Sequence, residues 1–485
     1  MTDTPAKTRL KNGTELRRMI VGLWQMADQE RDGKAFDLDA AAEVLADYAR
    51  SGFDTFDMAD HYGSAEIVAG KAARILAAEG RTPPVILTKW CPEPGPMDMG
   101  TVRAGVERAL ERLGQDRVDV MQFHWWRYES PDYVDAMMHL ERLREEGLIG
   151  GIGLTNFDAA HLHMLARHGL SIVSNQICFS LLDRRAAGDL AEVAEAEGVG
   201  LLGFGTLAGG FLSERWLDKP EPADIPDWSR MKYKRFIDTV GGWTRFQALL
   251  AALSGVAKRH GVSISNVATR WVLEQKAVAS VIVGVRLGEN DHRADNLKSL
   301  SFPFDAEDRA AISEATGALD PVPGDCGDEY RKPPFLTASG DLSHHLDALP
   351  PVFGVRQIGA RTIAESGSIW EERAGFSRAT RIGNRILVSG TTATDPHGNP
   401  VAENDPAGQA TYALDKIAAA ITSLGGALDN VVRTRIYVSN EDDWEPVSQV
   451  HRRYFGAVRP ANTLVKAGLI GPYLVEIEAE AVIPD

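Results

Sequence analysis

Between Arg18 and about Leu300, short apolar runs alternate with longer amphipathic segments. A short apolar run bounded by turn residues is typical of a buried strand, and an apolar residue at every third or fourth position is typical of a helix. The alternation predicts repeated βα units, in which helices cover a parallel sheet. The eight predicted strands begin at Met19, Phe53, Val85, Asp119, Gly150, Ile172, Gly200 and Ser280.

The connections between these strands decide between two parallel-sheet folds. Helical segments such as LDAAAEVLADYARSG and PDYVDAMMHLERLREEG join the strands and end in glycine, which favours a helix C-terminus. An open doubly wound sheet would need a GxGxxG phosphate loop after its first strand, and no predicted strand is followed by one. The pattern therefore favours an α/β fold with a closed (β/α)8 TIM barrel, for which about 250 residues are typical.

A polar stretch rich in proline interrupts this periodicity after the eighth unit. Its prolines are Pro321, Pro323, Pro333, Pro334, Pro350 and Pro351. Such a stretch is typical of a domain boundary. We predict a barrel over residues 1–320, a linker over 321–357 and a second domain over 358–485, whose elements follow the order ββαβαββ of a smaller α+β fold.

Composition narrows the possible partners. The chain has 485 residues and a net charge of −16, without the basic clusters that bind a phosphate backbone, so we expect no nucleic-acid partner. Three distant cysteines without paired spacing predict reduced thiols and no metal site. An apolar signal segment and a membrane span are both missing from the pattern, and we expect a cytoplasmic protein without a membrane partner.

Four chemically active side chains lie at or just after the ends of predicted strands. Asp57 ends the second strand, Lys89 the third and His124 the fourth, and Tyr62 follows Asp57 in FDMADHYG. The carboxyl ends of barrel strands carry the active site. Because a buried Asp or Lys is costly unless it is paired, we expect an ion pair between Asp57 and Lys89 beneath Tyr62.

This arrangement suits the reduction of a carbonyl group. A phenol titrates near pH 10, and an adjacent ammonium group lowers that pKa, so Tyr62 is a candidate proton donor beside Lys89. His124 is placed to hydrogen-bond the carbonyl oxygen while negative charge develops on it. A cofactor must then supply the hydride.

The same segments resemble the aldo-keto reductase superfamily over roughly residues 15–320. GFDTFDMADHYGSAE is similar to the family signature around its Asp and Tyr, and VILTKW and DVMQFHWW are similar to its Lys and His strands. The resemblance implies that the four residues act as inferred above. Met58 stands where Thr is usual, and WWRYE replaces the common Trp-Pro after the histidine.

The resemblance also implies a cofactor site. Thr155 and Asn156 match the pair that holds the nicotinamide carboxamide, Gln176 matches its third partner, and Phe204 matches the aromatic residue that stacks on the ring. Arg286 matches the residue at the adenosine phosphate, and a guanidinium there favours the 2′-phosphate of NADP(H) over NAD(H). The remaining implied contacts are Gly205, Thr206 and Leu207 at the pyrophosphate, Gly284 at the adenosine phosphate and Asn296 at the adenine.

Four tryptophans at strand ends predict an aromatic substrate pocket: Trp24, Trp90, Trp125 and Trp126. The segment from Trp216 to Trp243 is long for a βα loop. It either covers the site or packs at the periphery, and the sequence leaves both interpretations open.

Residues from about 370 to 485 resemble the Rid family (YjgF/YER057c/UK114), small trimeric proteins of which the best known hydrolyse enamines and imines. GFSRATRIGNRILVSGTTATD, QATYALDKIAAAI, VVRTRIYVS, RPANTLV and LVEIEAEAVI follow the family order, which implies a fold like that of chorismate mutase and a homotrimer. Ser389, Thr463 and Glu476 match the corresponding residues of the family. Phe376 replaces the usual Tyr, and Asn462 replaces the arginine that clamps a substrate carboxylate, so that clamp is lost. The domain either hydrolyses an uncharged imine or enamine or serves as a trimerisation and binding module.

Three functions are consistent with these patterns. The first is an NADP(H)-dependent reductase or alcohol dehydrogenase acting on a small carbonyl or alcohol compound. The second is an NADPH-binding sensor or regulatory subunit with little turnover. The third is a two-step enzyme in which the Rid-type domain hydrolyses an imine or enamine and the barrel reduces the resulting ketone.

Overall fold

The computed structural model describes residues 4–30, 36–225, 227–289, 291–331 and 351–484. A short hairpin, β1 (Lys7–Arg9) and β2 (Glu15–Arg17), precedes the first barrel strand. Among the described residues, no helix is long and apolar enough to cross a membrane.

Eight parallel strands close into a barrel in the order β10-β3-β4-β5-β6-β7-β8-β9. Each predicted strand is confirmed: β3 (Met19–Gly22), β4 (Thr55–Asp57), β5 (Val85–Trp90), β6 (Val118–His124), β7 (Ile149–Thr155), β8 (Ile172–Cys178), β9 (Gly200–Phe204) and β10 (Val278–Gly284). The predicted (β/α)8 TIM barrel is therefore confirmed, and it places every strand's carboxyl end on one face.

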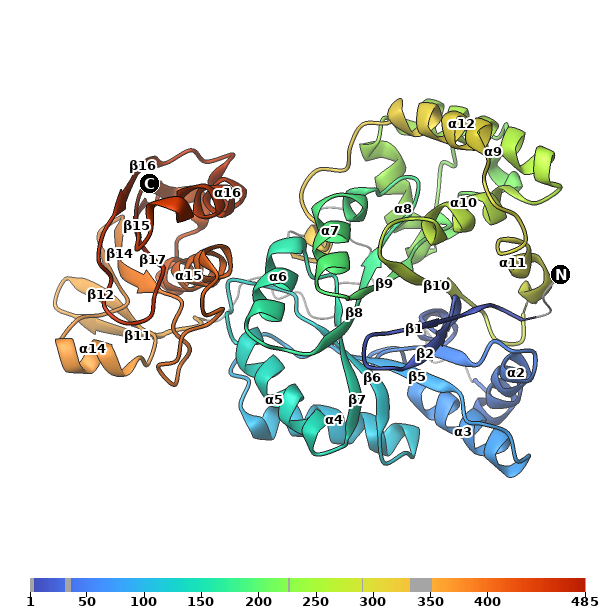
Figure 1. Ribbon diagram of the computed structural model, residues 1–485, viewed down its shortest axis with the longest axis horizontal. Coiled ribbons are helices and arrows are strands. Elements are labelled where there is room, and N and C mark those ends of the chain that lie inside the picture. The colour runs from blue at the N-terminus through green and yellow to red at the C-terminus, as the bar shows by residue number, and fades with distance from the viewer. Residues whose placement is uncertain (1–3, 31–35, 226, 290, 332–350, 485) are drawn as a thin grey trace.

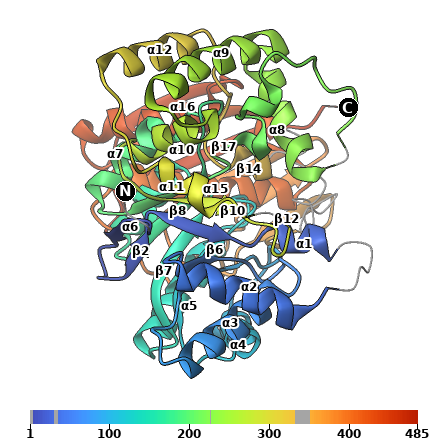
Figure 2. The same ribbon diagram turned by 90° about the vertical axis from the view of Figure 1, so that its right-hand side faces the viewer.

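Helices surround these strands (Figures 1 and 2). The main ones are α2 (Leu38–Arg50), α3 (Ala65–Ala78), α4 (Met99–Leu113), α5 (Tyr133–Glu145), α6 (Ala159–Arg167), α7 (Asp189–Ala196), α9 (Gly242–His260), α10 (Ile264–Leu273) and α12 (Ala306–Gly317). Shorter or additional ones are α1 (Gln25–Gln29), α8 (Trp228–Thr239), α11 (Arg293–Lys298) and α13 (Asp328–Arg331). The carboxylate of Asp158 accepts the backbone N–H of His161 and so fixes the start of α6.

The second domain contains a seven-stranded sheet in the order β11-β12-β13-β14-β17-β15-β16. Its strands are β11 (Gly354–Ile358), β12 (Arg361–Glu365), β13 (Ala379–Ile382), β14 (Arg385–Thr392), β15 (Val431–Val438), β16 (Ala461–Lys466) and β17 (Val475–Val482). Helices α15 (Pro406–Ser423) and α16 (Trp444–Phe455) share an apolar core with the sheet, and α14 (Ile369–Ala374) is short. The predicted α+β fold is confirmed, with the hairpin of β11 and β12 added to its edge.

The interval assigned from sequence to a linker, residues 321–357, contains two ordered elements. Helix α13 lies on the barrel side, and strand β11 joins the sheet of the second domain. Residues 332–350, with Pro333, Pro334 and Pro350, lie outside the described part of the chain.

Helix α15 packs against α6 of the barrel, so the two halves share a direct contact (Figure 1). The contact is polar at its centre. Asp415 of α15 accepts a hydrogen bond of 2.6 Å from the Tyr133 hydroxyl, and its carboxylate lies 3.0 Å from Nε2 of His161. The opposite ring nitrogen of His161 lies 2.9 Å from Asp158, which also pairs with Arg453 of α16.

This network is buried and charged. Burial opposes protonation of His161, but the carboxylates of Asp158 and Asp415 raise its pKa. A buried charge is tolerated where partners surround it, and the loss of one partner would leave the others uncompensated. The contact therefore fixes the second domain to the barrel through specific groups.

Candidate active site

A buried ion pair forms the base of the site. Strand β4 carries Asp57 and strand β5 carries Lys89, and both side chains are less than 5% exposed. The Lys89 ammonium lies 2.8 Å from Oδ2 of Asp57 and donates a bond of 2.9 Å to the carbonyl oxygen of Met58. Burial lowers the pKa of Lys89, and the Asp57 carboxylate opposes that shift.

Two buried amides complete the surroundings of this carboxylate. Gln122 and Gln176 each donate to Oδ1 of Asp57, at 2.8 and 2.6 Å. Gln176 also donates a bond of 2.8 Å to Oε1 of Gln122. Sequence reasoning missed Gln122, although it stands two residues before His124 and a strand turns alternate residues to the same face.

Tyr62 lies above this pair. It occupies the turn between β4 and α3, is 9% exposed, and has the Lys89 nitrogen 4.9 Å from its ring centroid. His124 ends β6, stacks on Trp126 at 4.8 Å, and lies 3.3 Å from Nδ2 of Asn156. The structure thus brings together the four residues that sequence reasoning grouped.

The end of β7 presents buried polar atoms that suit a nicotinamide carboxamide. Oγ1 of Thr155 and Oδ1 of Asn156 are buried and have no hydrogen-bond partner among the described residues. Asn156 also has a positive φ of 58°, an uncommon conformation outside glycine that holds its side chain over the barrel mouth. A buried polar group left unpaired is costly, and a bound amide would remove that cost. Gln176, the third predicted partner, is already bonded to Asp57 and Gln122.

The loop after β9 carries the next predicted contacts, Phe204, Gly205, Thr206 and Leu207. Helix α8 covers this loop: a Cβ added at Gly205 would lie 2.1 Å from the Tyr233 hydroxyl. Within the segment from Trp216 to Trp243, helix α8 therefore packs over the loop that follows β9, and the covering interpretation stays a prediction. Thr206 is buried, and Phe204 and Leu207 are partly buried.

The remaining predicted cofactor residues lie past β10. A Cβ at Gly284 would meet the Gln25 side chain, and Asn296 is half-buried on α11. Nη2 of Arg286 lies 2.6 Å from Asp28 and 3.2 Å from Asp227. Its Nη1 lies 3.9 Å from Glu289, so the guanidinium has three acidic partners among the described residues.

The four tryptophans predicted for the substrate pocket separate into two pairs. Trp126 stacks on His124, and Trp24 precedes α1 at the carboxyl end of β3, so both lie at the barrel mouth. Trp90 packs against α4, where a Cβ at Gly105 would meet its indole, and Trp125 is fully buried and stacks on Phe123. Trp90 and Trp125 belong to the same hydrophobic cluster as Tyr62, and their assignment to the pocket stays a prediction.

Two further residues at the barrel mouth, Tyr330 and Lys232, were not predicted from the sequence. Tyr330 of α13 lies edge-on to His124, with ring centroids 5.3 Å apart, and its hydroxyl contacts the Lys232 ammonium. Both side chains are nearly buried. Tyr330 belongs to the interval assigned to a linker, where no periodic pattern indicated a site.

The residues predicted for a site in the second domain lie in two groups. Phe376, Ser389 and Glu476 lie along the second half of β14: Ser389 donates a bond of 2.8 Å to Ser377, next to Phe376, and a Cβ at Gly390 would meet the Glu476 carboxylate. Burial raises the pKa of Glu476, and Arg378 opposes that shift. The other group is Asn462 and Thr463 on β16, which β15 separates from β17 and Glu476.

Comparison with known proteins agrees with this geometry. Residues 18–316 match the aldo/keto reductase family, and residues 369–483 match the family described as endoribonuclease L-PSP. The chain belongs to the aldo/keto reductase family and is an oxidoreductase. More particularly, it is a fusion of such a barrel with a Rid-type domain, and both predicted resemblances are confirmed.

Individual relatives are similar to parts of the chain. Protein tas of Escherichia coli is 30% identical over 240 residues, which are 45% of this chain and 67% of that protein. An uncharacterized protein of Streptomyces coelicolor is 38% identical over 120 residues, 24% of this chain and 88% of its own length. The glycerol dehydrogenase AKR11B4 of Gluconobacter oxydans shares the fold, with a TM-score of 0.53, 21% identity, and coverage of 66% of this chain and 97% of that one.

One of the relatives is matched over less than half of its own length. Flagellar radial spoke protein 5 of Chlamydomonas reinhardtii is 28% identical over 223 residues, 40% of this chain, and the matched part covers 42% of that protein's length.

Proposed function

We propose that the barrel reduces an aldehyde or ketone, or oxidises the corresponding alcohol, with NADP(H) as cofactor and Tyr62 as general acid. The observation that carries this proposal is the position of Lys89, whose ammonium is paired with Asp57 at 2.8 Å and lies 4.9 Å from the centroid of the Tyr62 ring. A cation at this position favours loss of the phenol proton.

Four side chains have separate roles in the proposed reaction. When bound, the reduced nicotinamide supplies a hydride to the carbonyl carbon. Tyr62 donates its proton to the carbonyl oxygen, which becomes the alcohol hydroxyl, and Lys89 stabilises the charge left on the phenol oxygen. His124 hydrogen-bonds the same oxygen and orients it. Asp57 holds Lys89 in place through the buried ion pair.

The unpaired polar atoms of Thr155 and Asn156 support a nicotinamide cofactor at this mouth. The preference for NADP(H) rests on Arg286, where a 2′-phosphate would compete with Asp28, Asp227 and Glu289 for the guanidinium.

Replacing Arg286 by alanine is expected to weaken NADPH binding about 10- to 100-fold, the value of a charged hydrogen bond, and to leave NADH binding nearly unchanged. Fluorescence titration with both nucleotides measures this difference. Arg245→Ala, which removes a surface guanidinium on α9, is the matched control. An equal loss for both nucleotides, or none, would remove the case for a 2′-phosphate contact.

For the Rid-type domain we propose a homotrimer with sites shared between protomers. Phe376, Ser389 and Glu476 are separated from Asn462 and Thr463 within one chain, and a neighbouring copy could bring the two groups together.

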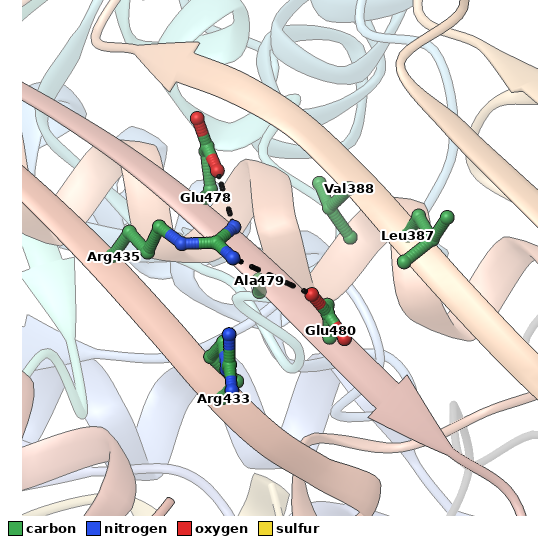
Figure 3. A pocket seen from close by; sticks show the side chains of 7 residues that line it. All are labelled: Leu387, Val388, Arg433, Arg435, Glu478, Ala479 and Glu480. Atoms are coloured by element: carbon green, nitrogen blue, oxygen red, sulfur yellow. Dashed lines mark hydrogen bonds and ion pairs between the residues drawn. The ribbon is translucent and has the colours of Figure 1, made fainter. Parts of the chain in front are cut away.

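The sheet has exposed surface on which such a neighbour could pack. Leu387, Val432 and Val465 are each more than 40% exposed, although they lie on strands. Figure 3 shows a pocket on β14, β15 and β17, where Arg435 pairs with Glu478 and Glu480. Exposed apolar patches with polar rims favour association.

Sedimentation equilibrium of the full chain is expected to give three times the chain mass of 52.8 kDa. Leu387→Glu places a charge on the exposed side of β14 and should yield monomers that retain the wild-type circular dichroism spectrum. A monomeric wild-type protein would exclude the shared sites and leave the domain as a module within one chain.

A further inference from the structure

Helix α13, which follows the barrel in the described part of the chain, lies at the mouth of the barrel. The Tyr330 ring lies 5.3 Å from His124 and 5.2 Å from Trp126, both centroid to centroid. The Lys232 ammonium contacts the Tyr330 hydroxyl and lies 5.6 Å from the centroid of the Phe204 ring. Tyr330 therefore stands between the two aromatic sides of the mouth, next to the residue proposed to orient the carbonyl oxygen.

Side chains and backbone of the barrel bind α13 and the residue before it. Arg331 donates a bond of 2.7 Å to the carbonyl oxygen of Asn156, and its guanidinium lies 4.0 Å from the Tyr128 ring centroid. Arg185 donates to the Glu329 carboxylate at 2.7 Å. Gly327 has a φ of 87°, and a Cβ there would lie 2.2 Å from the Asn156 carbonyl oxygen. The backbone next to Tyr330 therefore contacts Asn156, directly after the carboxyl end of β7.

The second domain binds the chain just before α13 through Arg453. Arg453 of α16 donates through Nε to Asp325 at 2.8 Å, five residues before Tyr330. Nη2 of the same guanidinium pairs with Asp158, the residue that caps α6. Asp158 is 2% exposed and Asp325 is 50% exposed, so one guanidinium links a buried barrel carboxylate to the chain segment at the mouth.

We propose that Tyr330 is a wall of the substrate pocket and that Arg453 is a positioning residue through which the second domain sets the pocket's shape. This inference rests on the proposed carbonyl chemistry. The Rid-type domain then contributes to the barrel reaction within one chain, independently of any chemistry of its own. The ligand that Tyr330 contacts is the carbonyl substrate beside His124, and the Tyr330 ring selects that substrate by size.

Asp325→Asn removes the negative charge from the link to Arg453, which weakens it, and leaves Arg453 paired with Asp158. With 4-nitrobenzaldehyde as probe, we expect KM to rise about 2- to 30-fold, while kcat at saturation and the Kd for NADPH stay constant. Asp320→Asn is the matched control, because Asp320 also follows α12 and pairs with Arg245 of the barrel. Tyr330→Ala should raise KM further, and Asp325→Asn should then add nothing to it.

A turnover-independent measurement accompanies these kinetics. In protein labelled with 3-fluorotyrosine, the ¹⁹F resonance of residue 330, assigned by its loss in Tyr330→Phe, should shift in Asp325→Asn and not in Asp320→Asn. An unchanged resonance together with an unchanged KM would overturn the inference. Absence of turnover in the wild type would instead overturn the proposed function, and the ¹⁹F shift would still decide whether Arg453 positions Tyr330.

Discussion

Tyr62→Phe is expected to lower kcat for carbonyl reduction about 10²- to 10⁴-fold, the usual contribution of a positioned acid. The substitution removes one hydroxyl from a side chain that is 9% exposed and keeps its ring against Lys89. NADPH binding should be unchanged, because no predicted cofactor contact is altered. Steady-state kinetics and nucleotide titration on the same preparation measure both quantities.

The matched control is Tyr48→Phe, which removes the same hydroxyl from a buried tyrosine on α2, next to Phe53. It should retain wild-type kcat. Equal turnover in Tyr62→Phe and the wild type across a carbonyl panel would rule out Tyr62 as the proton donor.

Lys89→Met is expected to have the largest effect on stability. It leaves the Asp57 carboxylate buried with Gln122 and Gln176 as its remaining donors. Breaking one side of a buried ion pair costs about 3–5 kcal/mol, because the other charge stays uncompensated. Urea unfolding should show this loss in the transition of the barrel, and carbonyl reduction should be lost as well.

The double variant Asp57→Asn/Lys89→Met separates these two effects. With both charges removed, most of the stability should return, since replacing both members of a buried pair is often nearly neutral. Activity should not return, because the cation beside Tyr62 is still missing. Recovery of turnover in the double variant would show that Lys89 acts through folding alone.

Much of the barrel could be predicted because its signals are local. Each strand is a short apolar run, and the pairing of Asp57 with Lys89 follows from the cost of burying either charge alone. The same reasoning could not separate Trp126, which stacks on His124, from Trp90 and Trp125, which belong to the hydrophobic cluster that contains Tyr62. Position at a strand end does not give the side of the strand on which an aromatic ring packs.

Contacts between segments that are far apart along the chain could not be predicted from the sequence. Tyr330 sits in an aperiodic interval, and its place above His124 depends on the anchors Arg331 and Arg453. The buried partnership of His161 with Asp415 joins residues 254 positions apart, on helices whose amphipathic patterns indicated burial but not a partner. The sequence predicted the presence of a second domain and left its contact with the barrel unspecified.

The most direct test of the account follows the hydride. Wild-type protein is incubated with NADPH deuterated at nicotinamide C4 and with 4-nitrobenzaldehyde, and the alcohol is analysed by mass spectrometry. We predict one deuterium at the carbinol carbon in the wild type and almost none in Tyr62→Phe over the same period. Tight NADPH binding without labelled alcohol, for this and other carbonyl probes, would contradict the account and favour a nucleotide-binding regulatory subunit.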